Sequence, residues 1–130
     1  MNKTILITGA ILGVLSVIFG AFAAHGLKEL ISVESQHTFE TAVRYQMYHA
    51  FLLLFVGITS FLTEKSKKTI YYLVIFGVLF FSGSIYGLST NTLTGFNFKT
   101  IAFITPIGGI LLIISWVVLL VGFYKMKAVK

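Results

Sequence analysis

Apolar residues along the chain gather into four runs that are separated by short polar segments. The first run covers Ile5 to Ala24, the third Ile70 to Leu88 and the fourth Ile101 to Phe123. Each is long enough for a membrane-spanning helix, which needs about 20 mostly apolar residues. The second run, from Ala50 to Leu62, is too short by itself. It reaches spanning length only if the polar residues from Arg44 onward also enter the membrane.

Long continuous runs indicate helices rather than strands. Backbone amides in lipid must find hydrogen-bond partners within the protein, so only helices and closed β-barrels span membranes. The strands of a barrel would appear as short segments of alternating polarity. The sequence therefore predicts an all-α fold, an integral membrane four-helix bundle formed by a single domain, 1–130. The expected spanning helices cover about 4–25, 43–62, 69–88 and 101–123.

The composition agrees with a lipid environment. The chain is 57% apolar and 11% charged, against about 45–50% and about 25% in soluble domains. The net charge of +6 does not indicate nucleic-acid binding, because the lysines lie beside the apolar runs, as membrane-flanking charges do. The absence of cysteine excludes disulfides and thiolate metal sites.

Basic residues in the flanking segments predict the orientation, because cytoplasmic segments of membrane proteins carry more lysine and arginine. With the amino terminus inside, the inner set is Lys3, Lys65, Lys67, Lys68, Lys125, Lys127 and Lys130. The outer set is then smaller and consists of Lys28, Arg44 and Lys99. We therefore expect both termini in the cytoplasm.

Small residues at spacings of three and four share one face of the first predicted helix. They are Gly9, Gly13, Ser16, Gly20 and Ala24. Glycine pairs also occur in the third and fourth runs, at Gly83 and Gly87 and at Gly108 and Gly109. Small residues allow membrane helices to approach closely. We expect these glycine-rich faces to pack inside the bundle or, alternatively, to form a homo-oligomer.

Polar side chains concentrate in the outer third of the predicted bundle. The candidate ligand-binding residues are His25, Glu40, Arg44, Gln46, Tyr48, His49 and Thr105. A charge at the centre of a bilayer costs about 2.5–3.5 kcal/mol on insertion scales, so such residues need a partner or a function. The spacing of Glu40 and Arg44 predicts an ion pair across one helical turn.

This cluster has two interpretations. In the first, Arg44 anchors a lipid headgroup or a small anion in a pocket open to the outer leaflet, with His25 and His49 as hydrogen-bond donors or proton acceptors. In the second, the same side chains only bond neighbouring helices or extend to the headgroups. His25, His49 and Glu40 are also zinc-type ligands, but their spacing matches no metal-binding motif. We predict no metal and no cofactor.

Four segments carry a resemblance to a known family. They are Gly20–Leu27, Phe39–Ala50, Phe81–Tyr86 and Ile104–Gly109. Together they resemble the domain-of-unknown-function 423 family of small bacterial membrane proteins, and the similarity extends over nearly the whole chain. Ala23 departs from the pattern, because relatives often carry glycine there. The resemblance implies four membrane spans and an unassigned activity, and it supplies no catalytic residue.

We therefore predict a small multi-pass protein of the bacterial plasma membrane without an assigned biochemical role. The leading functional hypothesis is the binding of a lipid headgroup or small anion at the outer-leaflet cluster. The alternatives are a structural or assembly subunit, and an oligomeric channel or transporter. An enzyme is the least favoured class, because the sequence contains no nucleophile triad, phosphate loop or dinucleotide fingerprint. The expected partners are membrane lipids and further copies of the chain, and not nucleic acid.

Overall fold

Four long helices make up most of the protein. The computed structural model describes residues 1–95 and 97–126. The helices are α1 (Asn2–Ala24), α2 (Val33–Ile58), α3 (Glu64–Ser89) and α4 (Ile104–Lys125), with short 3-10 turns η1 (Leu27–Glu29), η2 (Asn91–Leu93) and η3 (Phe98–Ile101). The described residues contain no strand, so the predicted all-α fold is confirmed. Lys127 and Lys130, which the orientation argument uses, lie outside the described residues.

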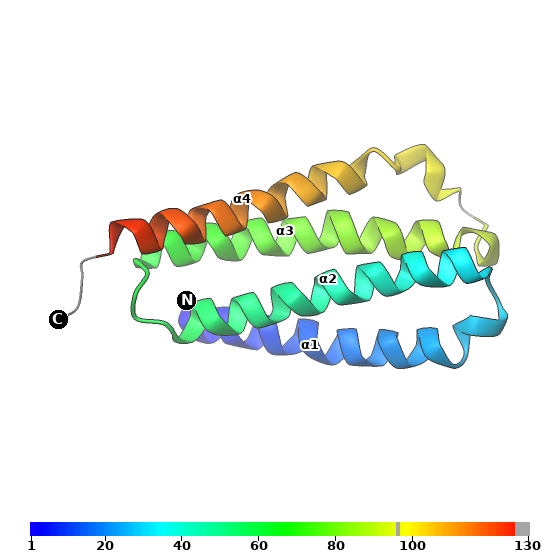
Figure 1. Cartoon of the computed structure of the whole chain (residues 1–130), viewed down its shortest axis with the longest axis horizontal. Helices are drawn as coiled ribbons and strands as arrows, with labels where there is room; N and C mark the ends of the chain where they lie inside the picture. Colours follow the sequence, from blue (N-terminus) through cyan, green and yellow to red (C-terminus); the bar gives the residue numbers. More distant parts are fainter. Residues whose placement is uncertain (96, 127–130) are drawn as a thin grey trace.

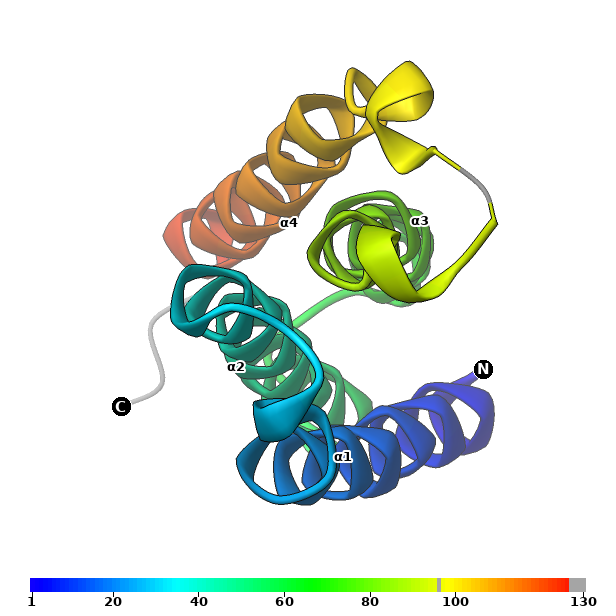
Figure 2. The ribbon, with the colours of Figure 1, turned by 90° about the vertical axis from the view of Figure 1, so that its right-hand side faces the viewer.

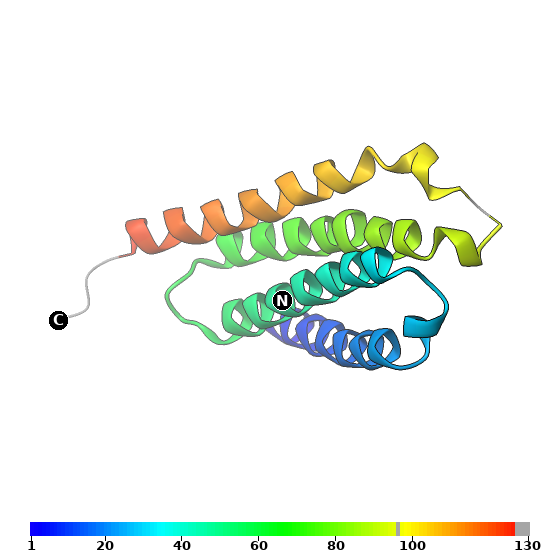
Figure 3. The ribbon, with the colours of Figure 1, turned by 45° about the vertical axis from the view of Figure 1, so that its right-hand side comes forward.

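The helices form two antiparallel hairpins, α1–α2 and α3–α4, which meet where α2 packs against α3. As a result, α1 and α4 lie on opposite sides of the α2–α3 pair (Figures 2 and 3). The beginning of α1, the end of α4 and the α2–α3 connection lie at one end of the molecule (Figure 1). The two connections with 3-10 turns lie at the other end.

Local sequence explains where the helices begin. The Ser32 hydroxyl caps α2 by accepting a hydrogen bond from the Ser35 amide at 3.1 Å, and Thr63 caps α3 through the Ser66 amide at 3.1 Å. Both helices therefore start before the apolar runs do. In contrast, α4 starts at Ile104 and not at 101. Pro106 has no N–H and is tolerated best in the first turn of a helix, where the N–H groups have no partner within the helix. A helix that began at 101 would place Pro106 beyond this turn.

Three of the described helices, α1, α3 and α4, are long and apolar enough to cross a membrane. The polar residues in the first half of α2 lower its hydropathy, so α2 is not among them. Only 17% of the most apolar segment of α1 and 22% of that of α4 is buried inside the protein. Many of their leucine, isoleucine and valine side chains therefore face outward, as expected for helices in lipid.

Glycines allow the closest helix contacts. A Cβ on Gly9 would lie 3.1 Å from the Ala50 carbonyl oxygen of α2. A Cβ on Gly108 would lie 2.3 Å from the backbone nitrogen of Phe81 in α3. The predicted packing of glycine faces inside the bundle is therefore present at both positions. The described apolar core forms between these contacts and includes the fully buried Leu53 and Ile70.

We expect Gly108→Ala to destabilise the protein by about 1–3 kcal/mol, because the new methyl group would overlap the α3 backbone and force the helices apart. The neighbouring Gly109→Ala is the matched control, since its Cβ would lie 3.6 Å from a flexible ring atom of Phe81. This control is expected to be neutral or stabilising, because alanine favours helix over glycine. Reversible unfolding in mixed micelles measures both, and equal stabilities would contradict the close contact.

Candidate functional site

Gln46 joins three helices. Its side chain is buried, and its Nε2 donates to the backbone carbonyl of Leu12 in α1 at 3.0 Å. Its Oε1 accepts a hydrogen bond from the hydroxyl of Tyr86 in α3 at 2.6 Å. Both ends of the amide therefore bond other helices. Because the Leu12 carbonyl can only accept, the atom facing it must be the amide nitrogen, and the oxygen faces Tyr86.

His49 joins α2 to α4 in a similar way. It is buried, and its Nδ1 lies 2.6 Å from the Tyr45 carbonyl oxygen one turn earlier. Its Nε2 accepts a hydrogen bond from the indole N–H of Trp116 at 3.1 Å. Because an indole N–H can only donate, Nε2 must be unprotonated and Nδ1 must carry the proton. His49 is therefore a neutral structural link in this geometry.

Other polar side chains complete the links between helices. The hydroxyl of Thr105 in α4 bonds that of Ser84 in α3, and Ser82 of α3 donates to the Ala42 carbonyl oxygen of α2 at 2.8 Å. Gln36 of α2 donates to the carbonyl oxygen of Ala23 in α1 at 3.0 Å. Among the described residues, every buried side-chain nitrogen and oxygen has a hydrogen-bond partner. The buried polar residues are thus fully satisfied within the fold.

The buried links lie deeper than the outer third where the sequence predicts them. Gly9 faces Ala50, and Gln46 bonds Leu12, which is near the middle of α1. The same register puts His49 beside Trp116 in the central part of α4. Gln46 and His49 are therefore level with the middle of their neighbours, whereas Gln36 bonds Ala23 at the end of α1.

The remaining candidates lie on the surface. His25 is exposed at the end of α1. Arg44 is exposed and donates from Nη2 to the Thr41 hydroxyl at 3.1 Å. The carboxylate of Glu40 lies 3.8 Å from Nδ1 of His37. The structure thus gives Arg44 and Glu40 other neighbours on α2, in place of the expected pair with each other.

The predicted residues therefore divide into two groups instead of forming one pocket. Gln46, His49 and Thr105 point into the helix interfaces, whereas His25, Glu40, Arg44 and Tyr48 face outward to different degrees. No group of three or more histidine, aspartate or glutamate side chains that could hold a metal ion occurs in the part of the chain that the structure describes. His25, Glu40 and His49 thus form no ligand set there.

Sequence reasoning missed Tyr86 and Trp116 as partners of the polar cluster. The chain has a single tryptophan, in the middle of an apolar run. Such a side chain must find an acceptor for its N–H when water is absent. This requirement is a signal that could have identified Trp116, whereas its pairing with His49 depends on how α2 and α4 cross.

An exposed face of α2 combines charged and aromatic residues, and we call it the α2 stripe. Its members are His37, Thr41, Arg44, Tyr48 and Phe51. Tyr48 and Phe51 are 51% and 64% exposed. Arg44 precedes Gln46 by two residues, or about 3 Å of helix rise. Arg44 therefore lies nearer the start of α2 than Gln46 does, and its guanidinium, which bonds the Thr41 hydroxyl, lies nearer still.

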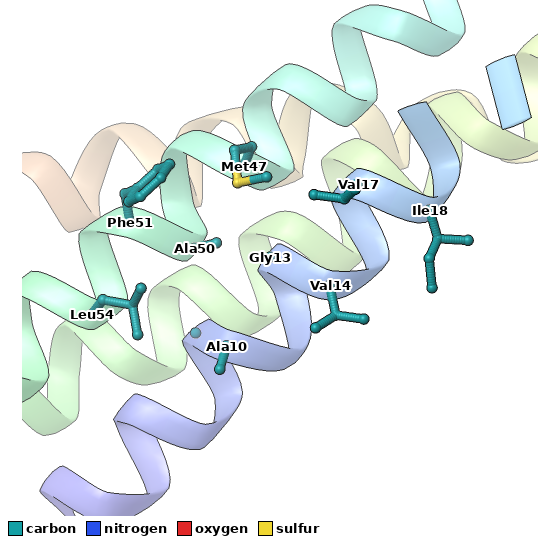
Figure 4. A pocket seen from close by; sticks show the side chains of 10 residues that line it. Ala10, Gly13, Val14, Val17, Ile18, Met47, Ala50, Phe51 and Leu54 are labelled. Atoms are coloured by element: carbon teal, nitrogen blue, oxygen red, sulfur yellow. The ribbon is translucent and has the colours of Figure 1, made fainter. Parts of the chain in front are cut away.

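An apolar groove lies between α1 and α2, beside the α2 stripe, and shares Phe51 with it (Figure 4). It has a volume of about 480 Å³, and its walls include Gly13 and Val14 of α1 and Met47, Phe51 and Leu54 of α2. The groove exists because α1 meets α2 closely at Gly9, whereas a Cβ on Gly13 would have no atom within 4 Å. Its lining suits hydrocarbon and offers no group for a charged ligand.

Comparison with known proteins gives a family but no activity. The family model described as "Protein of unknown function (DUF423)" matches residues 19–109. A UPF0382 membrane protein of Staphylococcus saprophyticus is 40% identical over 95% of this chain and 98% of its own length. The UPF0382 membrane protein YwdK of Bacillus subtilis is also 40% identical, over 95% and 98% of the two chains.

A more distant relative extends the same family. A UPF0382 membrane protein of Haemophilus influenzae is 34% identical over 98% of this chain and 99% of its own. No solved structure gives a significant match. The resemblance stated from the sequence is confirmed, and the chain belongs to the DUF423 family of small membrane proteins, which has no assigned biochemical role.

Proposed function

We propose that this protein is a multi-pass protein of the bacterial plasma membrane and acts there as an assembly subunit. Its four helices form a scaffold, and the α2 stripe binds another membrane protein. Both termini lie in the cytoplasm. In support, α1 begins and α4 ends at the same end of the molecule, beside the α2–α3 connection that is followed by Lys65, Lys67 and Lys68. Segments rich in lysine favour the cytoplasmic side.

The observation that carries this proposal is the exposed face of α2 on which the charged Arg44 is followed by the aromatic Tyr48 and Phe51. Contact of a charged side chain with hydrocarbon is unfavourable, and the cost reaches about 2.5–3.5 kcal/mol on insertion scales at the bilayer centre. Among the described residues the buried side-chain nitrogens and oxygens already have partners, and an exposed Arg44 in a membrane needs an acceptor group and protection from hydrocarbon. A protein surface with an acceptor group meets that need.

Membrane lipids are a second partner, and the α1–α2 groove supports this. Its apolar walls and open position at Gly13 suit one acyl chain. A phosphate group on Arg44, from a lipid headgroup or a free anion, remains a competing hypothesis for the α2 stripe. Phosphate is a good partner for guanidinium, but it would leave the exposed rings of Tyr48 and Phe51 without a protein contact. The accessibility experiment below separates the two hypotheses.

Single cysteines test the topology, because the native chain contains none. We expect Lys65→Cys in right-side-out vesicles to react with a membrane-impermeant maleimide only after the vesicles are opened. Thr92→Cys, in the connection at the other end of the molecule, should react before opening. Reversed labelling of the two positions would contradict the proposed orientation.

Accessibility of the α2 stripe tests the assembly function. A spin label on Tyr48→Cys in native membranes should be shielded both from oxygen, which concentrates in lipid, and from a water-soluble nickel complex. Ile110→Cys on α4 is the matched control, since Ile110 is 56% exposed and Tyr48 51%. The control should be accessible to oxygen. High oxygen access at Tyr48→Cys would mean a lipid-facing stripe, and high nickel access a water-filled path. Either result would refute the proposal.

The buried links have a structural role that can be measured separately. Gln46→Leu and Tyr86→Phe each remove the bond between α2 and α3, so the two changes together should cost less than their sum. We expect a coupling energy of about 0.6 kcal/mol, with an upper limit of about 1.7 kcal/mol, as for other bonds between membrane helices. Unfolding in mixed micelles supplies the four free energies. Strict additivity of the two changes would show that the bond contributes nothing.

A further inference from the structure

We infer that the protein covering the α2 stripe is a second copy of this chain, and that the two copies form a parallel dimer about a two-fold axis. In this dimer, Arg44 of each copy pairs with Glu40 of the other. The inference rests on the proposed function, which requires only that some protein covers the stripe. It names the partner and the contact, and it involves a face different from the glycine-rich faces that the sequence suggested.

The spacing of the α2 stripe fits a helix pair. The five positions from His37 to Phe51 follow each other at intervals of 4, 3, 4 and 3 residues. This is the repeat by which one helix contacts another along a left-handed seam. Within one copy, Arg44 bonds Thr41 and the Tyr48 ring packs on that of Tyr45 at a centroid distance of 5.5 Å, so these contacts stay on α2 itself and Arg44, Tyr48 and Phe51 remain exposed. Two copies in the same membrane have the same orientation, so their α2 helices can lie side by side in parallel.

The charges on this face complement themselves. The Arg44 side chain runs toward the start of α2, as its bond to the Thr41 hydroxyl shows. Its guanidinium therefore approaches the level of Glu40, whose side chain is 35% exposed. About a two-fold axis this contact occurs twice, so two arginines and two glutamates neutralise each other. Only one nitrogen of Arg44 is occupied by Thr41, which leaves further N–H groups for a carboxylate.

Aromatic side chains continue the contact below the charges. Tyr48 and Phe51 are both more than half exposed and follow Arg44 along the same seam. The seam ends at Phe55, whose ring packs edge-on against Phe123 of α4 at a centroid distance of 5.9 Å. The free part of α2 is therefore its outer half and its middle, which is the region that carries Arg44.

Other surfaces suit a second copy less well. The space beside Gly9 is already occupied by α2 and that beside Gly108 by α3. A Cβ on these residues would lie 3.1 and 2.3 Å from backbone atoms of the neighbouring helix. The α1–α2 groove is open, but its lining has no acid to pair with Arg44. The α2 stripe is therefore the described surface that joins exposure, helical spacing and charge complementarity.

Disulfide formation in membranes is the first test. Tyr48→Cys lies on the proposed axis, and because the chain has no cysteine of its own, any disulfide must join two molecules. We expect copper phenanthroline to convert Tyr48→Cys to a covalent dimer much faster than Ile110→Cys, whose side chain is similarly exposed on α4. Equal rates for the two variants would overturn the dimer.

A charge exchange tests the pairing itself. Arg44→Glu alone and Glu40→Arg alone should each weaken dimerisation about 30-fold or more, because each leaves like charges face to face in a desolvated contact. The double variant with both changes should restore it. The readout is fluorescence energy transfer between labelled copies in lipid vesicles, at several protein-to-lipid ratios. Both side chains are on the surface, so circular dichroism is expected to be unchanged in all three variants.

The outcomes separate this inference from the proposed function. The Tyr48→Cys spin label can be shielded in native membranes while labelled copies of the purified protein show no energy transfer in vesicles. In that case a different protein covers the stripe, and only the dimer is refuted. If the label is accessible to oxygen, both fail. If native mass spectrometry finds a phospholipid or inorganic phosphate that is lost in Arg44→Ala, the stripe binds phosphate and the dimer is refuted. A double variant that stays monomeric also refutes the Arg44–Glu40 contact.

Discussion

The hydrogen bonds of Gln46 to Leu12 and Tyr86 are the interaction on which the rest of the structure depends. In lipid, helices gain little from burying apolar surface against one another, so close packing and polar links must hold them together. Gln46 reaches α1 with its nitrogen and α3 with its oxygen, and His49 one turn later reaches Trp116 of α4. One polar segment of α2 thus connects all four helices. This explains why the least apolar of the four helices lies in the interior of the fold.

The same links limit where the remaining polar groups can go. The face of α2 that carries Ala42, Gln46 and His49 bonds the neighbouring helices. The opposite face of α2 points away from them, toward the surroundings of the protein. In this chain the opposite face carries Arg44 and Tyr48. In the function that we propose, this exposed face is the surface that binds the partner.

Sequence patterns were sufficient for the all-α fold, because the requirement for internal backbone hydrogen bonds leaves few alternatives to helices in lipid. They also identified the polar residues of α2. They could not divide those residues into buried and exposed groups, because Arg44 and Gln46 are two positions apart and the direction of each depends on which neighbours α2 contacts. The pairing of His49 with Trp116 and of Thr105 with Ser84 joins residues far apart along the chain. Spacing within one helix carries no information about such contacts.

The depth of the polar residues shows why the register between helices matters for function. Judged from its own apolar run, α2 would enter the membrane near Arg44, and the guanidinium would lie among headgroups. The contact of Gly9 with Ala50 and the bond of Gln46 to Leu12 place Gln46 near the middle of α1, whereas the bond of Arg44 to Thr41 directs the guanidinium back toward the start of α2. An arginine among headgroups needs no explanation, because its side chain can extend to water. An arginine on an exposed helix face can instead pair with a carboxylate, and in the dimer that we infer this carboxylate is Glu40 of the second copy.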